Sequence, residues 1–316
     1  MPGCVIPRRT LLAGLAAGPL ALPRPRRAAA QTPKIRAGGT FSDTFAEGFY
    51  ANARGSFQQA GLAVEVIQFA NGPAQMTAVL GGALEIGLSD TVSLGTAIAK
   101  GAPFVFIAGG GMYRSQAPTT ALCVPLASAI ETAADLVGKT VAVLGLRDVT
   151  EIGTWAWLER NGVRPEQVKF AEIPLPQVAL ALGRGAVDAG ILAEPFLSQN
   201  KDKTVRVLAY VFDAVAPQFF ISDWFTSKTY AAQNGASVRR FVEVVYDTAR
   251  WANAHRAASA PILSNVTKIP LAIVQRMTRV TYGTALNPRL LDPVFAAMYR
   301  FRVIDHRLTT ADVTAA

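Results

Sequence analysis

The strongest constraint on the fold is a regular alternation of short apolar runs, rich in β-branched residues, with longer stretches of helical periodicity. This order is typical of a mostly parallel sheet whose connections cross its faces as helices. A first set of segments predicts strands 34–38, 63–69, 84–88 and 104–108, with helices 42–59, 73–81 and 91–100. The sequence therefore predicts an α/β fold of mostly parallel sheet flanked by helices.

A second set of segments repeats the pattern after three consecutive glycines at 109–111. It predicts strands 120–125, 139–144, 168–172, 186–192 and 205–209, with helices 132–137, 151–161 and 176–183. After about residue 214 the pattern changes to one short strand, 219–223, and then mainly to helix as far as about residue 302. This tail has too little strand for a lobe of its own, so we expect its helices to pack on the first lobe.

Two chain crossings, near residues 114–119 and 213–218, then divide the chain into two lobes. We expect lobe 1 to contain residues 31–116 and 215–316, and lobe 2 to contain residues 117–214. Ligands of open parallel sheets bind beyond the carboxyl ends of the strands. Two facing sets of strand ends predict a cleft between the lobes that closes over a small molecule by hinge bending.

Residues 1–30 have the order of an export signal: a basic start, an apolar stretch and a small-residue exit. Arg8-Arg9 followed by two leucines resembles a twin-arginine signal, although Pro7 leaves the general secretory route as an alternative. The apolar stretch, about twelve residues broken by prolines, is shorter than the roughly 20 that span a bilayer, which argues against membrane insertion. We expect cleavage near Ala30 and a periplasmic product.

The net charge of +9 depends largely on that segment, because its five arginines account for five of the nine excess positive charges. Without these arginines the chain has 26 basic and 22 acidic residues. The remaining basic residues form no cluster that would follow a phosphate backbone, so nucleic acid is not an expected partner. Cys4 lies in the signal, which leaves Cys123 alone and rules out an intramolecular disulfide after cleavage. We expect a monomer.

Polar and aromatic side chains follow the predicted strands of the first lobe. Oxygen-bearing groups there can cap a helix or contact a ligand, and aromatic rings can belong either to the core or to a binding site. Glycine lets a backbone approach the ligand, and a helix start can bind an anion through its free amides. The candidate ligand-binding residues are Thr40, Phe41, Ser42, Asp43, Asn71, Gly72, Gln75, Ser89, Asp90, Thr91 and Tyr113, beside Arg114.

Two strand ends of the second lobe supply further candidates. Residues 145–151 lead into a helix that Asp148 or Thr150 is expected to cap, while Arg147 pairs either with a neighbouring acid or with the ligand. Pro195 restricts Glu194 to an extended backbone at the end of another strand. The candidates from these loops are Arg147, Thr150, Glu151, Glu194 and Phe196.

Several segments resemble the nitrate/sulfonate/taurine-type periplasmic binding proteins, a family that also includes binders of thiamine-pyrimidine precursors. They are GLAVEV at 61–66, GALEIG at 82–87, LVGKTVAV at 136–143, and GAVDAG at 185–190 followed by Glu194-Pro195-Phe196. The resemblance implies a type II periplasmic binding protein fold with a ligand between the lobes. It also implies an ABC permease and its ATPase as partners, and it favours Glu194 most among the candidate contacts.

Catalysis is the less favoured interpretation. The sequence contains no Cys/His metal spacing, no phosphate loop and no Gly-x-Ser-x-Gly turn, so no cofactor or metal is expected. One enzyme-like relative, a pyrimidine synthase of thiamine biosynthesis, consumes a histidine and depends on a cysteine-rich segment that this chain lacks. His255 and His306 lie in the tail, where surface or packing roles are expected. The favoured function is binding of a small solute for transport, and the candidate solutes are sulfonates, pyrimidine-like compounds, amines and organic acids. The other alternative is a ligand-sensing subunit of a signalling system.

Overall fold

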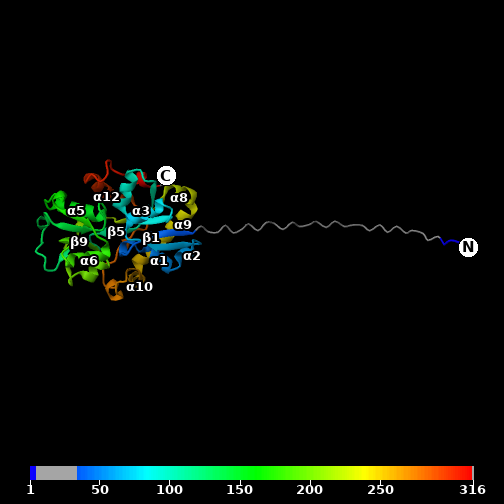
Figure 1. The fold of residues 1–316 in the computed structure, drawn as a ribbon, viewed down its shortest axis with the longest axis horizontal. Coiled ribbons are helices and arrows are strands. Elements are labelled where there is room, and N and C mark those ends of the chain that lie inside the picture. Colours follow the sequence, from blue (N-terminus) through cyan, green and yellow to red (C-terminus); the bar gives the residue numbers. More distant parts are fainter. Residues whose placement is uncertain (5–33, 315–316) are drawn as a thin grey trace. The chain divides into compact units, whose positions relative to one another are not determined.

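Two five-stranded β-sheets, each flanked by helices, organise the chain from residue 34 onward (Figure 1). The computed structural model describes residues 1–4 and 34–314, so all but the first four residues of the predicted export signal lie outside the described residues. Figure 1 shows α5, β9 and α6 on one side, β1, α1, α2 and α3 on the other, and β5 between them. No helix in the described ranges is long and apolar enough to cross a membrane.

The first sheet has the strand order β2-β1-β3-β12-β4. Its strands are β1 Ile35–Gly39, β2 Val64–Gln68, β3 Ile86–Asp90, β4 Phe104–Gly109 and β12 Ser222–Ser227. The strand β12 arrives from the tail and runs antiparallel to β3 and β4, while β1, β2 and β3 are parallel. The connecting helices are η1 Asp43–Phe45, α1 Glu47–Ala53, α2 Ser56–Gln59, α3 Gly72–Leu80 and α4 Thr91–Ala99.

The second sheet has the order β10-β6-β9-β7-β8 and the same plan, with β6 as its antiparallel member. Its strands are β6 Thr120–Pro125, β7 Thr140–Val143, β8 Lys169–Glu172, β9 Ala189–Ala193 and β10 Val205–Ala209. Its helices are η2 Ala134–Leu136, α5 Val149–Arg160, η3 Pro165–Gln167, α6 Leu175–Gly183, α7 Phe196–Asn200 and η4 Val211–Ala214.

A short antiparallel sheet of order β11-β5-β13 lies where the chain passes between the two larger sheets. It contains β5 Gly111–Arg114, β11 Gln218–Phe220 and β13 Thr281–Tyr282. Strand β5 directly follows β4, and strand β11 directly precedes β12. Both chain passages are therefore paired with each other through backbone hydrogen bonds.

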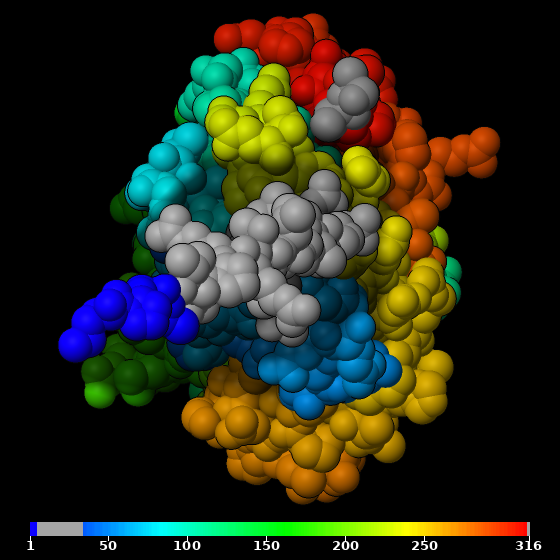
Figure 2. Space-filling view, turned by 90° about the vertical axis from the view of Figure 1, so that its right-hand side faces the viewer, coloured from blue at the N-terminus to red at the C-terminus, as the bar shows by residue number. Residues whose placement is uncertain are grey.

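The tail consists of helices that pack on several earlier elements. They are α8 Lys228–Gln233, α9 Gly235–Ala254, α10 Arg256–Thr267, α11 Leu271–Val274, α12 Pro288–Arg300 and α13 Thr310–Val313. Helices α9 and α10 pack on α1, and Figure 2 shows these yellow and orange residues beside the blue first helices. Helix α12 contacts both α4 and α5, and an ion pair of 2.8 Å between Arg300 and Glu159 joins α12 to α5. The tail therefore also reaches the second sheet.

The predicted α/β class is confirmed, and most strand predictions agree with the structure to within a few residues. The predicted helix 42–59 is instead three short helices, and Gly55, with a left-handed φ of 68°, separates α1 from α2. The predicted helix 132–137 is only a 3₁₀ turn. The predicted strand 219–223 is two strands, β11 and β12, which belong to different sheets.

Candidate functional site

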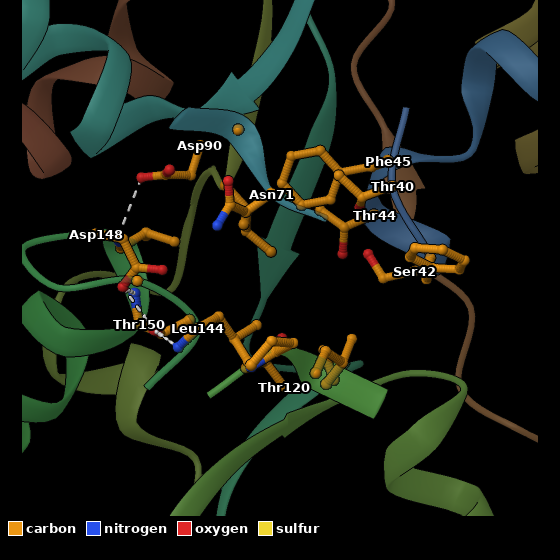
Figure 3. A pocket seen from close by; sticks show the side chains of 18 of the residues that line it. Thr40, Ser42, Thr44, Phe45, Asn71, Asp90, Thr120, Leu144, Asp148 and Thr150 are labelled. Atoms are coloured by element: carbon orange, nitrogen blue, oxygen red, sulfur yellow. Dashed lines mark hydrogen bonds between the residues drawn. The ribbon is translucent and has the colours of Figure 1, made fainter. Parts of the chain in front are cut away.

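A pocket of about 860 Å³, partly open to solvent, lies between the strand ends of the two large sheets (Figure 3). This volume includes solvent at the open side of the pocket. From the first sheet's loops come Thr40, Phe41, Ser42, Thr44, Phe45, Asn71, Gly72 and Asp90. From the second sheet's loops come Leu144, Gly145, Asp148, Val149, Thr150, Glu172, Pro174, Leu175, Pro176 and Ala193.

Four α-helices begin at this pocket; α3, α4 and α5 each have a side-chain cap at the N-terminus, and α6 follows Pro174 without one. The side chain of Asn71 accepts a hydrogen bond from the N–H of Ala74 at the start of α3. Asp90 accepts from the N–H of Ser93 in α4, and Asp148 accepts from the N–H groups of Thr150 and Glu151 in α5. Capping fixes these side chains at the strand ends, because each must reach back to satisfy amides that have no intrahelical partner.

Two hydrogen bonds cross the pocket from one sheet to the other. Oδ1 of Asp90 accepts the backbone N–H of Val149 at 3.2 Å. The side-chain amide of Asn71 donates to Oε1 of Glu172 at 3.4 Å. These contacts hold the two walls together in the arrangement described here.

The carboxyl groups of Asp90 and Asp148 lie in a poorly solvated part of the pocket, and each side chain is only 6% exposed. Burial raises the pKa of Asp90. Burial, followed by the nearby negative charge of Asp90, raises the pKa of Asp148 well above its usual range. The hydroxyl and amide hydrogen bonds that Asp148 receives oppose this rise without cancelling it. The pocket therefore holds two interacting acids from different sheets.

A third buried acid, Asp223, lies on β12 behind this pair and does not line the pocket. Burial raises its pKa to about 8. Oγ1 of Thr91 lies 2.8 Å from the carbonyl oxygen of Phe220 and 2.7 Å from Oδ2 of Asp223. A hydroxyl has one hydrogen, so both contacts are hydrogen bonds only when Asp223 carries a proton.

Seven residues predicted from the sequence line the pocket. Three strand ends of the first sheet, those of β1, β2 and β3, and the start of α5 contribute, as the topology predicts for facing strand ends. The seven are Thr40, Phe41, Ser42, Asn71, Gly72, Asp90 and Thr150.

Asp43 lies outside the pocket lining and instead anchors the tail. Its carboxylate accepts hydrogen bonds from Nε and Nη2 of Arg279, from the hydroxyl of Tyr50 and from the N–H of Val280. The side chains of Asp43 and Arg279 are 0% and 6% exposed. This acceptor is fully engaged by the protein, so it has no oxygen available for a ligand.

Gln75, Ser89 and Thr91 also lie behind the pocket lining. Oε1 of Gln75 accepts the N–H of Leu88, and the Thr91 hydroxyl is used by Phe220 and Asp223. Gly72 covers Ser89 so closely that a Cβ on it would lie 2.1 Å from the Ser89 hydroxyl oxygen. The backbone of Gly72 therefore separates Ser89 from the cavity.

Tyr113, Arg147 and Glu151 make intramolecular contacts outside the lining. The hydroxyl of Tyr113 donates to Oδ1 of Asp213 at 2.7 Å. The carboxylate of Glu151 accepts the backbone N–H of Arg147, whose side chain is exposed, and burial raises the pKa of Glu151. Arg147 has a left-handed φ of 57°, which turns the chain into α5.

Glu194 and Phe196, the candidates that the family resemblance favours, are buried beside the pocket without lining it. The carboxylate of Glu194 accepts the N–H and the hydroxyl of Ser198 at 3.0 and 2.8 Å. Burial raises the pKa of Glu194 to about 7. Phe196 packs in a buried apolar cluster with Leu192 and Leu197.

Several lining residues were not among those predicted from the sequence. Asp148 was expected only to cap α5, but a carboxylate has two oxygens, and one can cap a helix while the other faces a ligand. Thr44, Phe45 and Glu172 follow the predicted strands closely enough to have been found by the same search. Phe212 comes from the chain passage between the sheets, for which the sequence has no local signal.

Comparison with known proteins agrees with this architecture. The family described as NMT1/THI5 like matches residues 43–259. The alkanesulfonate-binding protein SsuA of Xanthomonas axonopodis pv. citri, bound to MOPS, superposes with a TM-score of 0.75 at 20% identity, covering 89% of this chain and 98% of that one. No curated protein matches the sequence significantly.

Two other solved structures share the fold at similarly low sequence identity. The periplasmic aliphatic sulphonate binding protein SsuA of Escherichia coli has a TM-score of 0.71 at 18% identity, covering 90% of this chain and 92% of that one. The periplasmic nitrate-binding protein NrtA of Synechocystis PCC 6803 has a TM-score of 0.74 at 14% identity, covering 90% and 85%. The resemblance and the periplasmic binding protein fold expected from the sequence are both confirmed.

Proposed function

Because the chain belongs to the NMT1/THI5-like family, we propose that it is the solute-binding component of an ABC importer. It captures a small organic solute between two lobes and delivers it to a permease that is driven by its ATPase. The observation that carries this proposal is the pocket between the strand ends of both sheets, together with the two hydrogen bonds that cross it. The sulfonate- and nitrate-binding proteins that share the fold support it.

The proposed lobes are residues 31–116 with 215–316, and residues 117–214. Opening moves one large sheet away from the other about the paired strands β5 and β11, because these strands carry both chain passages. It breaks the Asp90–Val149 and Asn71–Glu172 hydrogen bonds, and ligand binding restores them. Hinge motion of this kind needs backbone changes at only a few residues.

Binding without turnover is the proposed role. The histidines His255 and His306 do not line the pocket, and His255 stacks instead on Trp251. The acids that line the pocket are placed to recognise a ligand. In this proposal residues 1–30 are removed on export, and the mature protein acts in the periplasm as a monomer.

A thermal-shift screen of the purified protein tests the proposal, with sulfonates, nitrate, pyrimidines, aromatic acids and amines as candidates. A ligand at 100 times its Kd raises the free energy of unfolding by about 2.7 kcal/mol. We expect one class to stabilise the protein, to remain chemically unchanged, and to be taken up by cells only when this protein and the permease of the proposed importer are both present. Turnover of the bound compound, or uptake that does not depend on this protein, contradicts the proposal.

A further inference from the structure

The charges that line the pocket have one sign. Its ionisable residues are Asp90, Asp148 and Glu172, and no Lys, Arg or His is among the lining residues in the described part of the chain. Arg147, from the loop before α5, has an exposed side chain outside the lining. A ligand that enters this pocket therefore meets negative groups and neutral dipoles.

Asp148 presents an unused oxygen to this space. Its Oδ1 accepts three hydrogen bonds, from the N–H and hydroxyl of Thr150 and from the N–H of Glu151. No group in the described chain donates to its Oδ2, since all three of these hydrogen bonds go to Oδ1. Oδ2 lies beside Gly145, where an added Cβ would come within 3.3 Å of it. Oδ2 is therefore the oxygen of Asp148 that is free to accept a hydrogen bond from a donor on a ligand.

At the starts of α4 and α5, Asp90 and Asp148 occupy amides that would otherwise attract an anion, whereas α6 begins at the pocket without a side-chain cap. The N–H of Ser93 at the start of α4 is bonded to Asp90, and those of Thr150 and Glu151 at the start of α5 are bonded to Asp148. Free amides at helix starts are a common way to bind oxyanions. Here an incoming sulfonate or carboxylate would have to compete with two internal carboxylates at close range.

Three aromatic rings form part of the apolar lining. Phe41 and Phe45 come from the loop after β1, and Phe212 comes from the chain passage opposite. Figure 3 shows Phe45 across the cavity from Asp148. Aromatic faces attract cations as well as apolar groups.

We propose that the pocket takes a small organic cation, an ammonium or amidinium group on an apolar or aromatic body, with the positive group held by Asp148 and Asp90. This inference rests on the proposed function and names the ligand class of the same site. The N–H donors of the cation fill the vacant acceptor Oδ2 of Asp148, and its charge offsets the repulsion between the two carboxylates. The aromatic side chains contact its body.

Isothermal titration of the full chain with matched compounds tests the ligand class. Benzamidine, benzylamine and phenethylamine form the cationic series, with benzoate, phenylmethanesulfonate and benzyl alcohol as anionic and neutral counterparts of similar size. We expect a cation to bind at least tenfold more tightly than its counterparts. Binding of an anion with equal or greater affinity, or no binding by any cation, overturns the ligand class.

Variants then connect binding to the two acids. Asp148→Asn keeps the helix cap, because asparagine caps about as well as aspartate, but it removes the charge. We expect it and Asp90→Asn each to weaken cation binding at least tenfold. Asp135→Asn is the matched control, because Asp135 also caps a turn, through the N–H of Thr132, but is exposed and outside the pocket. Cation binding that is equally strong in Asp148→Asn and the control overturns the proposal.

The pH dependence supplies a readout that does not depend on folding of the variants. The ionisable groups that face the ligand are Asp90, Asp148 and Glu172, and Asp223 lies buried behind Asp90. Raised pKa values at Asp90 and Asp148 mean that protons must leave before a cation binds, so its affinity rises from pH 5.5 to pH 8. Affinity that falls over this range contradicts a cation. An anion that binds and is transported overturns the ligand class alone, while a cation that binds without any role in uptake overturns the proposed function alone.

Discussion

Oδ1 of Asp90, at the start of α4, accepts the backbone N–H of Val149, the first residue of α5, at 3.2 Å. The two helices follow strands of different sheets, β3 and β7. One carboxylate therefore caps its own helix and also contacts the other half of the molecule. Any separation of the two sheets at the pocket must break this contact. Asp90 then keeps only the hydrogen bond from the N–H of Ser93, by which it caps α4.

Asp43 tests the distinction between a ligand contact and a structural anchor. Asp43→Ala leaves the buried guanidinium of Arg279 without its counter-charge, so we expect the free energy of unfolding to fall by about 3–5 kcal/mol. Asp247→Ala is the control, because its ion pair with Arg250 is exposed. Chemical denaturation measures both variants. Unchanged stability together with a loss of ligand affinity in Asp43→Ala would show that Asp43 is a ligand contact and not a structural anchor.

Gly72 tests how the pocket wall is packed. A Cβ at this position would lie 2.1 Å from Oγ and 2.9 Å from Cα of Ser89, so we expect Gly72→Ala to lower the free energy of unfolding by about 1–3 kcal/mol. Gly183→Ala is the matched control, because a Cβ there has no atom within 4 Å and lies at the end of helix α6. The control should be neutral or slightly more stable. Equal stability of the two variants would contradict the close approach of Gly72 to Ser89.

Asp223 predicts a pH dependence of stability. Its pKa is about 8 in the folded protein and near 3.8 when exposed, so between these values the folded state holds a proton that the unfolded chain has released. The free energy of unfolding then falls as pH rises, by up to about 1.4 kcal/mol per pH unit for one proton. We expect higher stability at pH 5.5 than at pH 8, and a shallower slope in Asp223→Asn. A variant with the wild-type slope would show that Asp223 is not the source.

Glu194 is the ligand contact that the family resemblance favours, whereas the pocket lining favours other residues, so a variant of Glu194 tests which of the two is right. Its carboxylate is bonded to Ser198 and lies outside the pocket lining, so we expect Glu194→Gln to change ligand affinity less than twofold. Thr150→Val is the comparison, because Thr150 lines the pocket and its hydroxyl donates to Asp148. Titration with any ligand found by screening measures both. A large loss in Glu194→Gln alone would place the ligand deeper than the pocket described here.

The sequence predicted the parts of this site that depend on local pattern. Apolar runs and caps locate strand ends, and these gave Asn71, Asp90 and Thr150 at the pocket. The role of Asp43 could not be predicted, because its partner Arg279 is 236 residues away in the chain. The insertion of β12 between β3 and β4 is likewise a long-range pairing without a local signal.

Asp148 shows a different limit. The sequence predicted either Asp148 or Thr150 as the cap of α5, and in the structure Asp148 is the cap. Its position opposite Asp90 depends on how the two sheets face each other, which follows from packing of the whole chain. The single sign of charge in the pocket becomes visible only when both walls are assembled.

A crystal structure of the protein with the compound that stabilises it most in the thermal-shift screen tests the central claim most directly. The account predicts an intact small molecule between the two sheets, in contact with Asp90 and Phe41 on one wall and with Asp148 and Thr150 on the other. A ligand bound elsewhere on the surface, or converted to a product in the pocket, would contradict it.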